Sequence, residues 1–95
     1  SIDLLMRSVA DKYGANAVGV LLSGMGTDGA TGLKGIHSSG GLTIAQDEHT
    51  SVIYGMPKVA VEEQAVTKIL PVNQIANFLT RVVKSRTKSQ ESRTK

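Results

Sequence analysis

Residues 17–36 read AVGVLLSGMGTDGATGLKGI. The first six of them are apolar and rich in β-branched side chains, which is typical of a short buried strand. A glycine-rich turn follows over residues 23–32, and Leu33 and Ile36 then recur at helical spacing. A strand, a glycine turn and a helix in this order form the first half of a βαβ unit. This stretch therefore predicts an α/β fold.

Helices and strands alternate along the rest of the chain. Apolar spacing predicts a helix before the first strand and two more helices beyond the one that follows the glycine turn, over residues 2–13, 56–64 and 73–84. Short apolar runs predict two more strands, over residues 42–45 and 65–70. Alternation of this kind is typical of a doubly wound, mostly parallel sheet with helices on both faces and right-handed crossovers. Three strands are few for such a sheet, so we expect a partial domain.

Local signals mark the ends of these elements. Gly14 is expected to close the first helix in a left-handed conformation, and Pro57 suits a first helical turn. Asn73 is interpreted as the N-cap of the last helix. We assign residues 1–84 to the α/β domain, and we expect residues 85–95, a basic segment rich in Ser and Thr, to be a disordered tail.

Composition narrows the class of protein. The chain has 95 residues, of which 40% are hydrophobic, and it contains no cysteine. Disulfides and cysteine-ligated metals are therefore excluded, and no His, Asp and Glu cluster has the spacing of metal ligands, so we expect no metal and no cofactor. We see neither an apolar run long enough for membrane insertion nor a signal peptide, which favours a cytoplasmic protein.

The basic character of the chain lies mostly at its end. The formal net charge is +3, but five of the eleven Lys and Arg residues fall within the last twelve positions. Because the body is close to neutral, we interpret the charge as a solvated tail and expect no nucleic-acid partner.

The turn over residues 24–29, GMGTDG, matches the G-x-G-x-x-G pattern of dinucleotide-binding folds, and Asp47 follows at about the required distance. One hypothesis is therefore a nucleotide-binding βαβ unit. Two features weigh against it. Asp28 would place a carboxylate where the pyrophosphate rests on the helix N-terminus, and a helix precedes the first strand.

A second interpretation makes Asp28 itself the functional group. It follows a strand of a predicted parallel sheet, so it lies at the edge where α/β proteins keep their sites. A carboxylate there can accept the Nδ1 proton of a histidine, and free amides of the same turn can stabilise an oxyanion. The alternative is that Asp28 only caps the helix beginning near Ala30.

Three stretches suggest a family. Residues 21–36, LLSGMGTDGATGLKGI, resemble the segment of chemotaxis protein-glutamate methylesterases that carries the aspartate of a Ser-His-Asp triad. Residues 43–61, TIAQDEHTSVIYGMPKVAV, resemble the next signature of that family, and residues 65–79, AVTKILPVNQIANFL, are similar to its closing strand and helix. The resemblance covers about residues 2–83.

The resemblance implies an activity. Family members hydrolyse glutamate methyl esters on chemoreceptors, and some deamidate glutamines; a receiver domain normally regulates them. By this resemblance Asp28 is the triad acid, and Met25 provides the backbone amide that stabilises the oxyanion. The residues that shape the loop would be Gly24, Gly26 and Gly29, and those near the cleft would be Met56 and Pro57.

The chain also departs from the family pattern. The nucleophilic serine turn and the histidine of the family lie before the aspartate, whereas the 27 residues preceding Asp28 contain neither motif. We therefore expect a carboxy-terminal part of the catalytic domain, inactive alone, whose partners are the upstream part of that domain, the receiver domain and the methylated chemoreceptor. The exposed sheet edge of such a part could also pair with a second copy.

Two further hypotheses remain open. Ser23, His49 and Asp28 could form a triad within this chain, because triads are recognised by geometry and not by sequence order. Alternatively, the chain could be a non-catalytic remnant that oligomerises. We interpret His37, which falls late in a predicted helix, as a surface residue.

Overall fold

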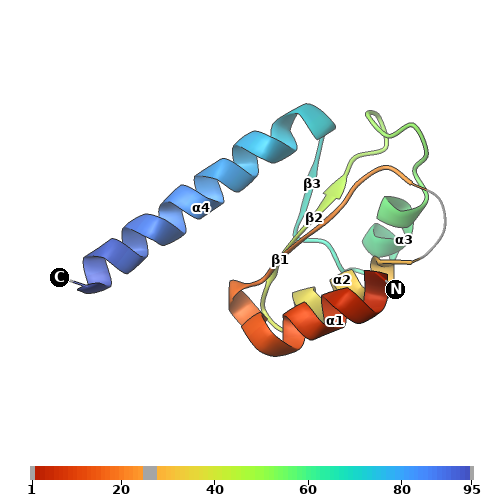
Figure 1. Cartoon of the computed structure of the whole chain (residues 1–95). Helices are drawn as coiled ribbons and strands as arrows, with labels where there is room; N and C mark the ends of the chain where they lie inside the picture. Colours follow the sequence, from red (N-terminus) through yellow and green to blue (C-terminus); the bar gives the residue numbers. More distant parts are fainter. Residues whose placement is uncertain (1, 25–27, 95) are drawn as a thin grey trace.

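The computed structural model describes residues 2–24 and 28–94, with side chains up to residue 87. Its elements alternate as the sequence predicts (Figure 1). In chain order they are α1 (Ile2–Tyr13), the 3-10 turn η1 (Gly14–Asn16), β1 (Val18–Leu21), α2 (Ala30–Ser38), β2 (Leu42–Gln46), α3 (Met56–Glu62), β3 (Lys68–Leu70) and α4 (Val72–Thr94).

The three strands form one parallel sheet in the order β1-β2-β3. Val18 lies beside Leu42 in the first pair, and Ile44 lies beside Lys68 in the second. Figure 1 shows α1, α2 and α3 gathered on one side of the sheet and α4 on the other. The predicted fold class, a partial doubly wound sheet with helices on both faces, is confirmed.

The core lies between the sheet and the helices on its α2 side. One buried cluster joins strand β1 to α2 and α3 through Leu21, Leu33 and Ala60. A second cluster joins α1 to α2 through Ala10 and Ile36. Leu33 and Ile36 are the positions that the helical spacing picks out, and their burial fixes α2 between α1, α3 and the sheet.

The helix ends agree with the sequence in part. Gly14 has a φ of +51° directly after α1, as expected for a residue that closes a helix. Pro57 occupies the first turn of α3, also as expected. Asn73 is not an N-cap, because α4 already begins at Val72 and the amide of Gln74 donates to the carbonyl of Pro71 at 2.9 Å.

The last helix is longer than predicted, and the third strand is shorter. Helix α4 continues to Thr94, so the expectation of an unstructured segment after residue 84 is wrong for residues 85–94. No Gly or Pro follows Pro71, and the segment is rich in Lys, Arg, Gln and Glu, which favour helix. The strand predicted over residues 65–70 is reduced to β3, because Ala65 packs into the core instead.

None of the helices within residues 2–24 and 28–94 is both long enough and apolar enough to cross a membrane.

Candidate active site

The carboxyl ends of β1 and β2 carry the residues that the sequence singled out. Ser23 and Gly24 follow β1, and Asp28 and Gly29 lead into α2. Met25 and Gly26 lie outside the described residues, so the oxyanion role predicted for Met25 and the loop-shaping role predicted for Gly26 stay predictions.

Gly24 joins the glycine turn to the segment that precedes α3. Its amide donates to the carbonyl of Ile53 at 2.9 Å. Its carbonyl accepts from the amides of Gly55 and Met56 at 3.1 and 3.0 Å, and Gly24 forms a parallel bridge with Tyr54. The two signature stretches, separate in sequence, therefore meet in one hydrogen-bonded unit at the end of the sheet.

The Met56 side chain lies close to two glycines of this unit. A Cβ atom placed on Gly24 would lie 2.6 Å from the Met56 Cε. Gly29 has a φ of +101°, which side chains rarely tolerate, and a Cβ there would lie 2.9 Å from the Leu21 Cδ2. Pro57, the residue after Met56 in the first turn of α3, is buried. Met56 thus lies against the glycine turn, and the predicted position of Met56 and Pro57 near the cleft stays a prediction.

Sequence reasoning missed Gln46, which ends β2 and is only 3% exposed. Its Oε1 accepts from the amide of Ser23 at 2.8 Å, and its Nε2 donates to the carbonyl of Thr50 at 2.8 Å. One buried side chain thus connects the glycine turn to the loop after β2. A glutamine closing an apolar strand is the sequence signal that could have identified it, because buried amides need partners.

The surroundings of two ionisable groups in the loop after β2 shift their pKa values. Hydrogen bonds from the hydroxyl and amide of Thr50, at 2.5 and 3.0 Å, hold the pKa of the Asp47 carboxyl below its usual value. Burial raises the pKa of the Tyr54 phenol. In a dinucleotide-binding protein the residue at the position of Asp47 would bind the ribose. Here the Asp47 carboxylate instead accepts hydrogen bonds from Thr50 within its own turn.

Asp28 is exposed and only loosely held. Its carboxylate oxygens accept from the amides of Ile2 and Asp3, both at 3.4 Å, which is longer than a typical N–H···O hydrogen bond. It does not cap α2, because the N-cap position belongs to Gly29 and no side chain of that position makes a capping bond. The capping alternative for Asp28 is therefore wrong, and the carboxylate remains accessible to a partner.

The start of α2 is not free to bind the phosphates of a nucleotide. The amides of Gly29 and Gly32, at the start of α2, both donate to the Asp3 Oδ1 at 2.8 Å. A pyrophosphate on this helix would need these same donors. A carboxylate of the chain already occupies the place, so the G-x-G-x-x-G match does not describe a phosphate cradle.

A triad within this chain does not form. The hydroxyl of Ser23 bonds to the backbone of Ile53, donating to its carbonyl at 3.2 Å and accepting from its amide at 3.0 Å. His49 is exposed, and among these described residues no hydrogen bond joins Ser23, His49 and Asp28.

His37 is not the simple surface residue that we expected. It is half-buried, and its Nδ1 lies 3.3 Å from the Thr43 hydroxyl and 3.4 Å from the Thr67 hydroxyl. The part of the chain that the structure describes contains no group of three His, Cys, Asp or Glu residues able to hold a metal ion.

Comparison with known proteins decides the family. The family model described as CheB methylesterase matches residues 1–79. The chain belongs to the CheB methylesterase family. It is 52% identical over 82 residues to protein-glutamate methylesterase/protein-glutamine glutaminase 4 of Anaeromyxobacter dehalogenans, covering 86% of this chain and 23% of that protein. It is 54% identical over 76 residues to the corresponding protein 1 of Carboxydothermus hydrogenoformans, covering 80% and 22%.

A solved member of the CheB family supports the fold. The crystal structure of the Thermotoga maritima CheB methylesterase catalytic domain superposes with a TM-score of 0.81 at 35% sequence identity. The match covers 84% of this chain and 42% of that domain. This chain therefore spans less than a quarter of the curated relatives named above and less than half of the solved catalytic domain.

Proposed function

We propose that this chain is the carboxy-terminal part of a chemotaxis protein-glutamate methylesterase catalytic domain and that Asp28 is its triad acid. The observation that carries the proposal is the position of Asp28: an exposed carboxylate at the carboxyl end of β1, with only long hydrogen bonds of its own. A histidine from the upstream part of the domain could approach it there.

The chemistry follows from this geometry. The Asp28 carboxylate accepts a hydrogen bond from the Nδ1–H of the histidine, holds its tautomer and stabilises the imidazolium that forms when the serine attacks the ester. The backbone amide of Met25 donates to the oxyanion of the tetrahedral intermediate. The substrate is a glutamate methyl ester on a chemoreceptor, and the products are methanol and glutamate; a glutamine amide would be hydrolysed along the same route.

The loop contacts support these roles. The amide of Met56, at the start of α3, donates to the carbonyl of Gly24, and Gln46 ties Ser23 to the next loop. A site held in this way loses little free energy to reorganisation when the transition state forms. The complete protein would also carry a receiver domain that regulates access to the site, and it would act in the cytoplasm.

The edge of β1 is the surface through which the chain would meet the rest of its domain. β1 pairs with β2 on one side only, and its other edge ends the described sheet. Such an edge can take a preceding strand of the complete domain, or a second copy when the chain is alone. A mass that rises with concentration in light scattering would support self-pairing, and a monomer at all concentrations would contradict it.

Activity is best tested with a graft, called here the grafted enzyme, in which this chain replaces the matching segment of the Anaeromyxobacter dehalogenans relative. We expect the grafted enzyme to release methanol from methylated chemoreceptor, and we expect the isolated chain to release none. A folded graft without activity would overturn the proposal. Activity of the isolated chain would instead support a triad that includes Ser23 and His49.

A further inference from the structure

We propose that Asp3, a residue of α1 distant from Asp28 in sequence, is a positioning residue for the triad acid. This inference rests on the proposed function, since it assigns Asp3 a task in the same site. It starts from the two short hydrogen bonds that the Asp3 carboxylate makes to the first turn of α2.

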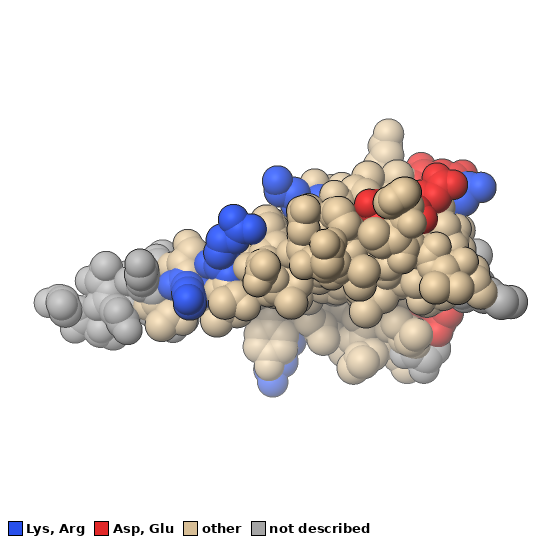
Figure 2. All heavy atoms as spheres, turned by 90° about the horizontal axis from the view of Figure 1, so that it is seen from above, with Lys and Arg blue, Asp and Glu red and all other residues tan. Residues whose placement is uncertain are grey.

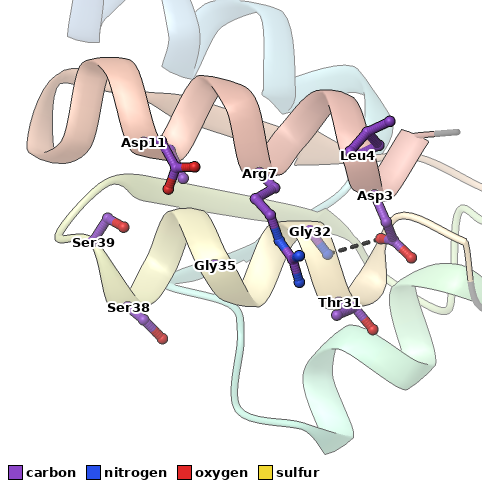
Figure 3. Close-up of a pocket in the computed structure, with 10 residues that line it drawn as sticks. Asp3, Leu4, Arg7, Asp11, Thr31, Gly32, Gly35, Ser38 and Ser39 are labelled. Carbon is purple, nitrogen blue, oxygen red and sulfur yellow. Dashed lines mark hydrogen bonds between the residues drawn. The ribbon is translucent and has the colours of Figure 1, made fainter.

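Both bonds are short, and both donors belong to the first turn of α2. The amides of Gly29 and Gly32 both donate to one oxygen of Asp3 at 2.8 Å, in a partly buried position. Figure 3 shows the Asp3 side chain reaching from α1 to the backbone of Gly32. The amides at the start of a helix have no partner within the helix, and a carboxylate also suits the positive end of its dipole.

Helix α2 has no cap of its own. Its N-cap residue is Gly29, which has no side chain, so the capping group has to come from another element. Gly32 makes this feasible, because a Cβ there would lie 2.6 Å from the Met6 Cβ and 3.1 Å from the Asp3 Cα. The two helices approach so closely at this point that the short Asp3 side chain can reach the donors.

The cap acts on Asp28 through the backbone. Gly29, whose amide binds Asp3, is the next residue after Asp28, so fixing this amide fixes the peptide that carries the triad acid. The Asp28 carboxylate cannot do this for itself, since its own bonds are 3.4 Å long and exposed. Asp3 never has to touch the substrate, and its role is to hold the acid where the histidine finds it.

The chain offers a matched control on the same helix. Asp11 is exposed, and it lines the same groove between α1 and α2, about 580 Å³ in volume, as Asp3 does (Figure 3). Among the described residues it makes no hydrogen bond to α2. The change Asp11→Ala therefore removes the same charge from the same groove without removing a cap.

The experiment measures kcat and KM of the grafted enzyme for Asp3→Ala, Asp3→Asn and Asp11→Ala. A displacement of about 1 Å can cost on the order of a hundredfold in rate, so we expect Asp3→Ala to lower kcat by about ten- to a hundredfold with little change in KM. Asp3→Asn keeps the acceptor oxygen and should recover most of the loss, because Asn caps helices well. Asp11→Ala should behave as the unmodified enzyme does.

The deciding measurement is Asp3→Ala in an Asp28→Asn background. If Asp3 acts through Asp28, the second change should lower kcat less than about twofold further, as expected for residues that act as a unit. An equal loss in both backgrounds, or no loss from Asp3→Ala alone, would overturn the inference while leaving the triad role of Asp28 intact. If Asp28→Asn alone leaves kcat unchanged, the proposed function fails, and the positioning role fails with it.

Discussion

The glycine end of the molecule and helix α4 are held in place by different kinds of interaction. At the glycine end, which comprises residues 23–24, 28–32 and 53–56, backbone amides and carbonyls meet at fixed distances and missing side chains create the space. In α4, Ile75 is the one buried side chain among residues 72–87, which are the helix residues with described side chains. The first region depends on tertiary geometry, and the second largely on helix propensity.

The two ends also differ in surface charge. Figure 2 shows basic side chains along the arm that α4 forms, and at the opposite end of the visible face it shows acidic side chains gathered with a basic one beside them. Exposed Lys and Arg side chains suit a solvated helix, whose stability owes little to any one contact. Substitutions should therefore have large effects at the glycine end and small ones in α4, and four changes test this contrast.

The largest effect is expected from Asp28→Asn. In the grafted enzyme it should lower kcat about ten-thousandfold, because the amide favours the wrong histidine tautomer. The unfolding midpoint should not fall, since the wild-type carboxylate makes only long, exposed bonds. Methanol release measures the first effect and thermal unfolding the second. Normal turnover in this variant would remove Asp28 from the mechanism.

The close approach of α1 and α2 gives the next test. Gly32→Ala should destabilise the chain by about 1–3 kcal/mol, because the new methyl group meets the Met6 Cβ and the Asp3 backbone. Gly35→Ala is the matched control one turn later in α2, where a Cβ meets nothing within 4 Å. It should stabilise the helix by about 0.5–1 kcal/mol. Urea unfolding measures both, and equal effects would show that the helices are not in tight contact.

The buried amide of Gln46 comes third. Gln46→Leu keeps the volume but leaves the Ser23 amide without its partner, which should cost about 1–3 kcal/mol. The exposed Gln74 of α4 is the control, and Gln74→Leu should change the free energy of unfolding by less than about 0.5 kcal/mol. A similar small effect at both positions would mean that Gln46 does not hold the loops together.

The smallest effect is expected in α4. Arg86 donates to the carbonyl of Asn16 at 2.8 Å, in an exposed position where water competes for both groups. Arg86→Gln should therefore cost less than about 0.5 kcal/mol in urea unfolding. If Arg86→Gln lowered the free energy of unfolding as much as Gly32→Ala does, α4 would be as important to stability as the glycine end.

Much of the fold could be predicted from local sequence. The helix over residues 2–13 and its closing Gly14 follow from apolar spacing and one glycine, and both are confirmed. The end of α4 could not be predicted, because net charge and polarity suggest disorder whereas good helix formers without Gly or Pro allow a helix to continue. Asn73 failed as a cap because α4 already begins at Val72 and the carbonyl of Pro71 accepts from the amide of Gln74.

The site was predictable as a set of segments but not as a set of contacts. The two signature stretches identified the family, which the family model then confirmed over residues 1–79. The cap by Asp3 and the amide of Gln46 escaped notice, because each joins residues more than twenty positions apart. Nothing in the local spacing of an aspartate or glutamine says which distant amide it will meet.

The sequence by itself determined the alternation of strands and helices, the family and the identity of the candidate acid, because periodicity, glycine patterns and motif letters are local properties. Only the tertiary structure decided that Asp28 caps no helix, that Asp3 occupies the anion site of α2, and that Gly24 and Met56 meet. These outcomes depend on how closely α1, α2 and α3 pack around the end of β1. The spacing between these helices is set by the packing of the whole core and not by any one segment.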